Sequence, residues 1–141
     1  MKTDLPQTIR LADYEPPAFS VESVDLTFDL EPHRTVVAAV LKLRRTGAAS
    51  GGPLVLDGED LDLLEVSVNG NKLTPPAYET SEESLTVFDP PETLTLETRV
   101  AINPKANTRL EGLYVSNTMF CTQCEAEGFR RITYFPDRPD V

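Results

Sequence analysis

The sequence contains one histidine, two cysteines and no tryptophan, and it has no long apolar run. Two cysteines cannot build the disulfide framework of a small secreted domain. A membrane-spanning helix needs about 20 consecutive apolar residues, and no stretch here approaches that length. The opening residues, MKTDLPQTIRLADYEPP, also lack the apolar segment of a secretory signal peptide. These absences predict a cytoplasmic protein that makes no membrane contact.

Positive charge is also scarce. The chain carries 13 lysines and arginines against 23 aspartates and glutamates, a formal net charge of -10 at pH 7. Nucleic acid binding depends on clustered basic side chains that displace counterions from the phosphates. A net negative field instead repels a polyanion, so nucleic acid is not expected as a partner. The apolar content of 40% over 141 residues is sufficient for one globular domain with its own core.

The dominant pattern is an alternation of apolar and polar residues, which is the period of a half-buried β-strand. Segments with this period, or short apolar runs between turn residues, are found at 24–30, 35–45, 53–56, 84–88 and 93–102. Asn69-Gly70 within 61–73 predicts a hairpin, because both residues accept the positive φ angles of a type I′ turn. With twelve prolines and no helical period, the chain is expected to be all-β, with an antiparallel β-sandwich or twisted sheets.

The alternation also predicts which side chains face the core. In 35–45 and 93–102 they are Val37, Ala39, Leu41, Leu43, Leu94, Leu96, Val100 and Ile102. In 24–30 and 61–68 they are Val24, Leu26, Phe28, Leu30, Leu64, Val66 and Val68.

Two polar turns are expected to be solvated. The acidic run DGED at 57–60 lacks the ligand spacing and terminal glutamate of an EF-hand calcium loop. His33 follows Pro32 between two predicted strands, and no recognisable motif places a nucleophile beside it. It is therefore expected to be a turn residue and not a general base.

Cys121 and Cys124 form a C-x-x-C motif near the end of the sequence. A redox pair of this type belongs at a helix N-terminus, where the dipole lowers the thiol pKa, and no helix is expected here. A structural zinc site needs four ligands, but the sequence offers no further cysteine and only His33. A redox role is therefore the weaker alternative, which titration of the thiols would test.

Glu125 and Glu127 follow this motif, and they would share one face if the segment were a strand. They form either a surface pair that balances Arg130 and Arg131 or an anionic site for a positively charged ligand group. Composition and spacing leave both interpretations open.

The sequence also resembles a known family. Residues 107–141, NTRLEGLYVSNTMFCTQCEAEGFRRITYFPDRPDV, closely resemble a region of the bacterial aminopeptidase N family, which consists of zinc-dependent enzymes of the gluzincin type. Two upstream segments resemble the N-terminal β domain of the same family: YEPPAFSVESVDLTFDLEPHRTVVAAVLKLRR and PLVLDGEDLDLLEVSVNG. The resemblance extends over most of the chain.

The resemblance implies that this chain is the N-terminal substrate-recognition and scaffold domain of a longer zinc metallo-aminopeptidase, which removes N-terminal amino acids from peptides. In that family a catalytic domain follows, where an H-E-x-x-H helix and a downstream glutamate bind zinc and a G-A-M-E-N stretch lines the cleft. None of these motifs occurs here, so zinc is expected to bind outside this chain, and the chain alone is expected to be inactive. The expected organisation is an extended arm at 1–18, a β-rich domain at 19–135 and, at 136–141, the start of a linker into the catalytic domain.

The resemblance also implies roles for two residues beside the cysteines. Glu125 matches a glutamate that binds the free α-amino group of the substrate, and Gln123 matches a glutamine that helps line the first side-chain pocket. The implied partners are the N-terminus of a peptide substrate and the protein's own catalytic domain. Glu127, Arg130 and Arg131 are expected to form an ion-pair set that shapes the loop, and the cysteines are expected to be small packing residues.

The alternative is a free-standing β-sandwich binding module without catalytic activity. Ile132, Tyr134 and Phe135 lie near the end of the sequence and are expected to form an exposed aromatic edge. Because an exposed apolar patch marks an interaction site, this edge favours the domain of a longer enzyme over the free-standing module.

Overall fold

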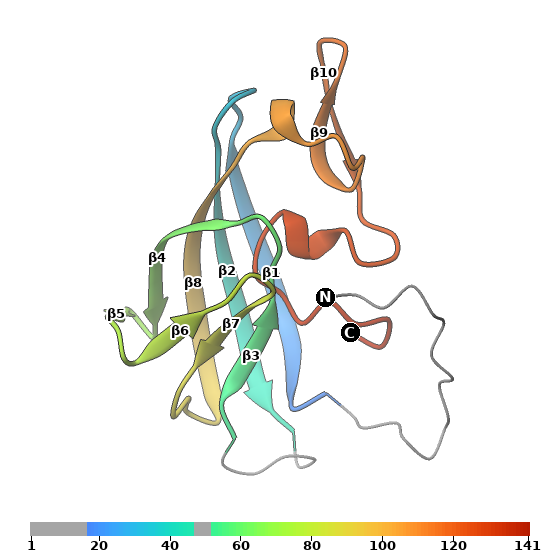
Figure 1. Cartoon of the computed structure of the whole chain (residues 1–141). Helices are drawn as coiled ribbons and strands as arrows, with labels where there is room; N and C mark the ends of the chain where they lie inside the picture. The colour runs from blue at the N-terminus through green and yellow to red at the C-terminus, as the bar shows by residue number, and fades with distance from the viewer. Residues whose placement is uncertain (1–16, 47–51) are drawn as a thin grey trace.

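The computed structural model describes residues 17–46 and 52–141, and it confirms the predicted all-β fold with antiparallel strands (Figure 1). The strands are β1 (Phe19–Asp29), β2 (Thr35–Arg45), β3 (Leu54–Asp57), β4 (Asp62–Val68), β5 (Asn71–Lys72), β6 (Tyr78–Thr80), β7 (Ser84–Val87), β8 (Thr93–Ile102), β9 (Gly112–Ser116) and β10 (Met119–Gln123). Two short 3-10 helices are η2 (Pro104–Ala106) and η3 (Phe129–Arg131). No helix within the described ranges has the length and apolar character to cross a membrane. The arm predicted at 1–18 lies outside the described residues as far as position 16.

The strands form three antiparallel sheets. The largest has the order β1-β2-β8-β4-β5, the second has the order β3-β7-β6, and the third is the hairpin of β9 and β10. In Figure 1 the long strands β1, β2 and β8 stand side by side, the smaller sheet lies in front of them, and the β9–β10 hairpin extends beyond one end. Apolar side chains from the first two sheets meet between them and form the core.

The core confirms the alternation predicted for β2 and β8. The side chains predicted to be buried in these strands are at most 8% exposed: Val37, Ala39, Leu41, Leu43, Leu94, Leu96, Val100 and Ile102. The register places Leu41 beside Leu96 and Val37 beside Val100. Burial of such side chains stabilises a fold by about 1.5–3 kcal/mol each, so β2 and β8 form the centre of the hydrophobic contact.

The inward face predicted for 61–68 is wrong at Leu64, which is 39% exposed. The pairing of β4 with β8 shifts register between Leu63 and Glu65. A shift of this kind changes the alternation, because one extra residue in a strand turns the next side chains to the opposite face. Leu63 is therefore half-buried, while Val66 is buried as predicted.

β1 forms one edge of the five-stranded sheet, and within the described residues it pairs only with β2. A register shift between Val21 and Ser23 interrupts this pairing. The apolar side chains at 24–28 are half-buried, in agreement with the alternation. Leu30 differs from its prediction: β1 ends at Asp29, and Leu30 is 51% exposed.

The hairpin predicted at Asn69-Gly70 is confirmed. β4 and β5 pair antiparallel through Val68 and Asn71, and both turn residues have positive φ angles, 49° at Asn69 and 83° at Gly70. The Asn69 side chain accepts a hydrogen bond from the backbone N–H of Thr95 (2.8 Å). This bond fixes the start of the turn to β8.

The last part of the chain returns to the core. Ile132 and Tyr134 are 2% and 3% exposed and Phe135 is half-buried, so the predicted exposed aromatic edge is wrong. The reason is an antiparallel bridge between Asp57 and Phe135, with backbone hydrogen bonds of 2.9 and 3.1 Å. The bridge places this segment beside β3, where the Tyr134 ring packs directly against the backbone of Gly58.

We expect Leu41→Ala to lower the free energy of unfolding of this chain by about 2–5 kcal/mol, because removal of a fully buried leucine side chain leaves a cavity. Leu30→Ala is the matched control and should change that free energy by less than about 0.5 kcal/mol, since the side chain is largely exposed. Urea unfolding followed by circular dichroism measures both variants. Equal losses would contradict the assigned core.

Candidate functional site

The residues that the resemblance singles out lie at the end of β10 and in the turn that follows. β10 ends at Gln123, and the next residues form a turn closed by a hydrogen bond from the Gly128 N–H to the Cys124 carbonyl oxygen (3.0 Å). Glu125 lies in this turn and not in a strand. Because the segment is not a strand, the condition under which Glu125 and Glu127 would share one face is not met.

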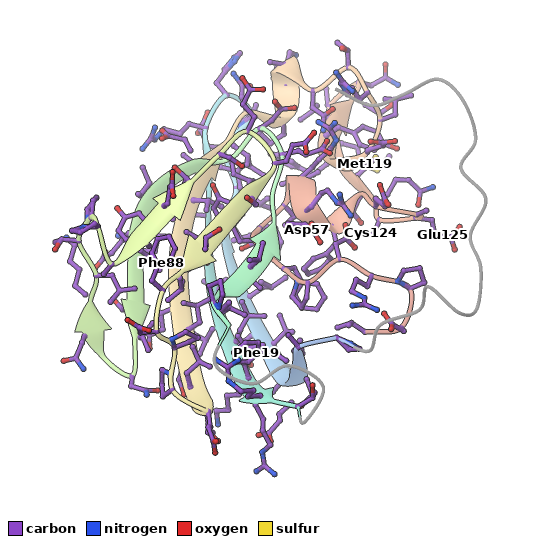
Figure 2. All side chains as sticks on the ribbon, turned by 60° about the horizontal axis from the view of Figure 1, so that its bottom comes forward. Phe19, Asp57, Phe88, Met119, Cys124 and Glu125 are labelled. Carbon is purple, nitrogen blue, oxygen red and sulfur yellow. The ribbon has the colours of Figure 1, made fainter. Side chains whose placement is uncertain are left out.

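Gln123 and Glu125 are both exposed. Figure 2 shows Glu125 directed away from the rest of the protein. The Gln123 Oε1 atom accepts a hydrogen bond from the Glu125 backbone N–H (3.4 Å), so the two residues are linked. The peptide bond between Glu125 and Ala126 is cis. A carboxylate in this position is open to a cationic group from outside.

Arg131 joins the base of this turn to two other parts of the chain. Its guanidinium contacts three carboxylates, with Nη2 at 2.5 Å from Glu59, Nη1 at 2.5 Å from Asp60 and Nε at 3.1 Å from Glu111. The Arg131 side chain is 7% exposed. The prediction that 57–60 is a solvated turn holds for Asp60, which is 79% exposed, but is wrong for Glu59, which is 14% exposed. Both carboxylates neutralise a cation that would be unfavourable so far from water.

Arg130 anchors the same segment through Asp137. The backbone N–H and the Nε–H of Arg130 both donate to Asp137 Oδ2 at 3.1 Å, and Nη2 donates to the Asp137 carbonyl oxygen at 3.1 Å. Nη2 also lies 3.7 Å from Glu127 and 3.9 Å from Asp57. The expected ion pair between Glu127 and an arginine is confirmed, but the closer partners of both arginines were not predicted.

Two clefts open beside Arg131, with volumes of about 240 and 640 Å³. Both are lined by Asp60, Arg109 and Arg131. Neither is lined by Gln123 or Glu125, so these two residues lie on an exposed surface beyond both clefts.

The two cysteines differ in their surroundings. Cys121 is half-buried and its Sγ donates to the Met119 carbonyl oxygen at 3.7 Å, whereas Cys124 is exposed, so the expected packing role is wrong for Cys124. Partial desolvation and the nearby Asp137 carboxylate raise the pKa of the Cys124 thiol. Because the thiolate is the reactive form of cysteine, this environment disfavours the redox alternative.

The remaining candidate residue is His33, which is exposed between β1 and β2, as predicted. Across 17–46 and 52–141, no group of three or more histidine, cysteine, aspartate or glutamate side chains is arranged to hold a metal ion. What the turn after β10 can do chemically is to present a carboxylate and an amide to a ligand.

We expect Arg131→Ala to lower the free energy of unfolding by about 3 kcal/mol. This is the low end of the range for breaking a buried ion pair, because the Asp60 and Glu111 side chains are themselves 79% and 49% exposed. Arg109→Ala is the control, and since Arg109 is exposed the change should stay within about 0.5 kcal/mol. Urea unfolding measures the free energy for both variants. Similar losses would show that the ion pairs of Arg131 with the three carboxylates do not specifically stabilise the fold.

A pH dependence follows from Asp57. Burial raises the pKa of the Asp57 carboxyl above its ordinary value of 3.8, although the Arg130 charge opposes this shift. A carboxyl that binds its proton more tightly in the folded state than in the unfolded state stabilises the fold at low pH. This contribution is complete below the unfolded pKa, and it is lost as the pH rises from 3.8 through the higher pKa of the folded state. Asp57→Asn removes this titration. As the pH rises from 3.8 through the folded pKa, the free energy of unfolding measured with urea should therefore fall less in the variant than in the unsubstituted protein. An NMR titration that gives the folded carboxyl a pKa at or below its ordinary value would contradict this.

Comparison with known proteins shows a relationship along the entire chain. Aminopeptidase N of Caulobacter vibrioides is 52% identical over 141 residues, which is 100% of this chain and 16% of that protein. The chain therefore spans about one sixth of the length of this relative. No protein-family model matches the chain.

Solved structures of other peptidases also resemble this chain. Legionella pneumophila aminopeptidase A, in complex with aspartic acid, is 33% identical with a TM-score of 0.85, over 94% of this chain and 16% of that chain. An M1 zinc metallopeptidase from Deinococcus radiodurans, bound to a Tyr-Ser-Ala substrate, shares the fold at 18% identity and a TM-score of 0.67, over 86% of this chain and 30% of that chain. The family resemblance read from the sequence is confirmed, because the chain is homologous over its whole length to part of the bacterial aminopeptidase N proteins.

Proposed function

We propose that this chain is the N-terminal substrate-recognition and scaffold domain of a longer zinc metallo-aminopeptidase, which removes N-terminal amino acids from peptides. The identity of 52% with an aminopeptidase N supports this function. The match covers only 16% of that protein, which supports one domain of a longer enzyme. The catalytic domain lies outside residues 1–141 in this proposal, and it is the chain's main partner.

Zinc belongs to that catalytic domain and not to this chain. In the family that the chain resembles, two histidines of an H-E-x-x-H helix bind the metal, whereas this sequence has a single histidine, His33. The described residues also form no cluster of metal ligands. The residues present do not fit a zinc site, so the proposal assigns zinc to the catalytic domain.

The observation that carries the proposal is an exposed carboxylate on an anchored turn. Glu125 faces away from the protein (Figure 2), while Arg130 and Arg131 hold the segment that follows its turn. A carboxylate that accepts a hydrogen bond from an ammonium group makes a charge-assisted contact worth about 1.5–3 kcal/mol. An exopeptidase cuts at a fixed distance from the free amine, so an anion at a fixed position aligns the scissile carbonyl with the reacting groups.

Gln123 is the second proposed contact with the substrate. It directly precedes the turn, and its Oε1 atom accepts the hydrogen bond from the Glu125 N–H, which orients the amide beside the carboxylate. In this arrangement Glu125 takes the α-amino group and Gln123 lines the pocket for the first side chain. The complex of the related Legionella enzyme with aspartic acid supports a site that recognises a single amino acid.

The reading frame beyond Val141 separates this proposal from a free-standing β-sandwich module. The burial of Ile132 and Tyr134 removes one argument against the module, so homology to a longer enzyme now favours the domain. A G-x-M-E-N stretch followed by H-E-x-x-H and a downstream glutamate would support the aminopeptidase. A stop codon soon after Val141 would favour the module.

In the full-length enzyme, Glu125→Ala should lower kcat/KM for an amino-acid arylamide by roughly 10- to 200-fold, which corresponds to about 1.5–3 kcal/mol of lost binding to the ammonium group. Glu79→Ala is the matched control, because Glu79 is also an exposed glutamate but lies on β6. Steady-state kinetics should leave that control unchanged. Unchanged kinetics for Glu125→Ala would refute the assigned role.

A further inference from the structure

The turn that carries Glu125 returns so close to β10 that its last residue has no room for a side chain. A Cβ atom at Gly128 would lie 2.3 Å from the Gln123 carbonyl oxygen and 3.0 Å from the Cys124 Cα atom. Close carbon–oxygen contacts are ordinarily about 3.3–3.6 Å, so a methyl group here would require β10 or the turn to move by about 1 Å.

Gly112 allows the same close approach from the other side. It pairs with Gln123 across the β9–β10 hairpin, and its φ angle is 73°. A Cβ atom at this position would lie 2.8 Å from the Arg131 Cβ atom and 3.2 Å from the Gly128 carbonyl oxygen. The start of β9, the end of β10 and the return of the turn therefore pack backbone against backbone next to Gln123.

The segment that leaves the turn is held as well. The Arg130 carbonyl oxygen accepts a hydrogen bond from the Glu59 N–H (3.0 Å), and the Arg130 side chain is bound to Asp137. With the segments on both sides of the turn held, the position of Glu125 depends on where the Gly128 backbone meets β10.

We propose that Gly128, together with the anchored segment that follows it, positions the Glu125 carboxylate for its contact with the substrate ammonium. This inference rests on the proposed role of Glu125. A misplacement of about 1 Å in a binding group can lower a rate by about 100-fold. Gly128 has no side chain to touch the substrate, so its effect on turnover is expected to pass through Glu125.

A double-mutant cycle in the full-length enzyme tests the inference. Gly128→Ala should lower kcat/KM for an amino-acid arylamide by about 10- to 100-fold. In an enzyme that already carries Glu125→Ala, the same change should have less than about a twofold effect, because the group that it misplaces is absent. Gly52→Ala is the matched control, since no atom lies within 4 Å of a Cβ there, and it should leave the kinetics unchanged.

The outcomes separate the positioning role from the proposed function. No effect of Glu125→Ala would overturn the function, and the positioning role with it. If Glu125→Ala lowers kcat/KM but Gly128→Ala gives the same loss in both backgrounds, the function stands and the positioning role is overturned, because a general structural defect does not depend on Glu125. Wild-type kinetics for Gly128→Ala would also overturn the positioning role.

If Gly128→Ala does not give a folded enzyme, Arg130→Lys takes its place in the cycle. Lysine keeps the positive charge but cannot reproduce the contacts of Nε and Nη2 with Asp137, so it loosens the segment that leaves the turn. The positioning role then predicts a loss that disappears in the Glu125→Ala background. Equal losses in both backgrounds contradict it.

Discussion

The position of the turn after β10 depends on the neutralisation of one buried cation. The Arg131 side chain is 7% exposed, and a guanidinium that far from water needs carboxylates around it. Two of its carboxylates come from the loop between β3 and β4, and the third precedes β9. The cluster therefore holds three segments of the chain together, and none of them can move without separating a charge from its partner. The position of the exposed turn after β10 is thus set by a buried guanidinium, although two of its partners, Asp60 and Glu111, are 79% and 49% exposed.

Much of the fold could be predicted from local sequence patterns. β8 spans the same residues, 93–102, that the alternation indicates, and Asn69-Gly70 locates a hairpin turn because the φ angles that the turn requires are a property of those two residues. The register shift before Glu65 has a different origin. It arises from the pairing of β4 with β8, so the sequence of β4 alone does not reveal it, and Leu64 was assigned to the wrong face.

The site was predictable only in part, for the same reason. The sequence shows that two adjacent arginines follow the turn, but the carboxylates that bind Arg131 lie up to 72 residues away, and no local pattern pairs them. Burial of Tyr134 likewise depends on a bridge to Asp57 in a distant strand. Gln123 and Glu125 were singled out by the family resemblance, because spacing alone did not distinguish a recognition site from a surface pair.

The outer edge of β1 is protected by charge. A long edge strand presents backbone groups that can pair with a strand of another molecule. Along this edge Asp25 and Asp29 are exposed, and the register shift between Val21 and Ser23 makes the strand irregular. Two copies that met edge to edge would bring like charges together, with a net charge of -10 on each chain adding to the repulsion. The acidity of the chain therefore opposes self-association through the edge of the sheet.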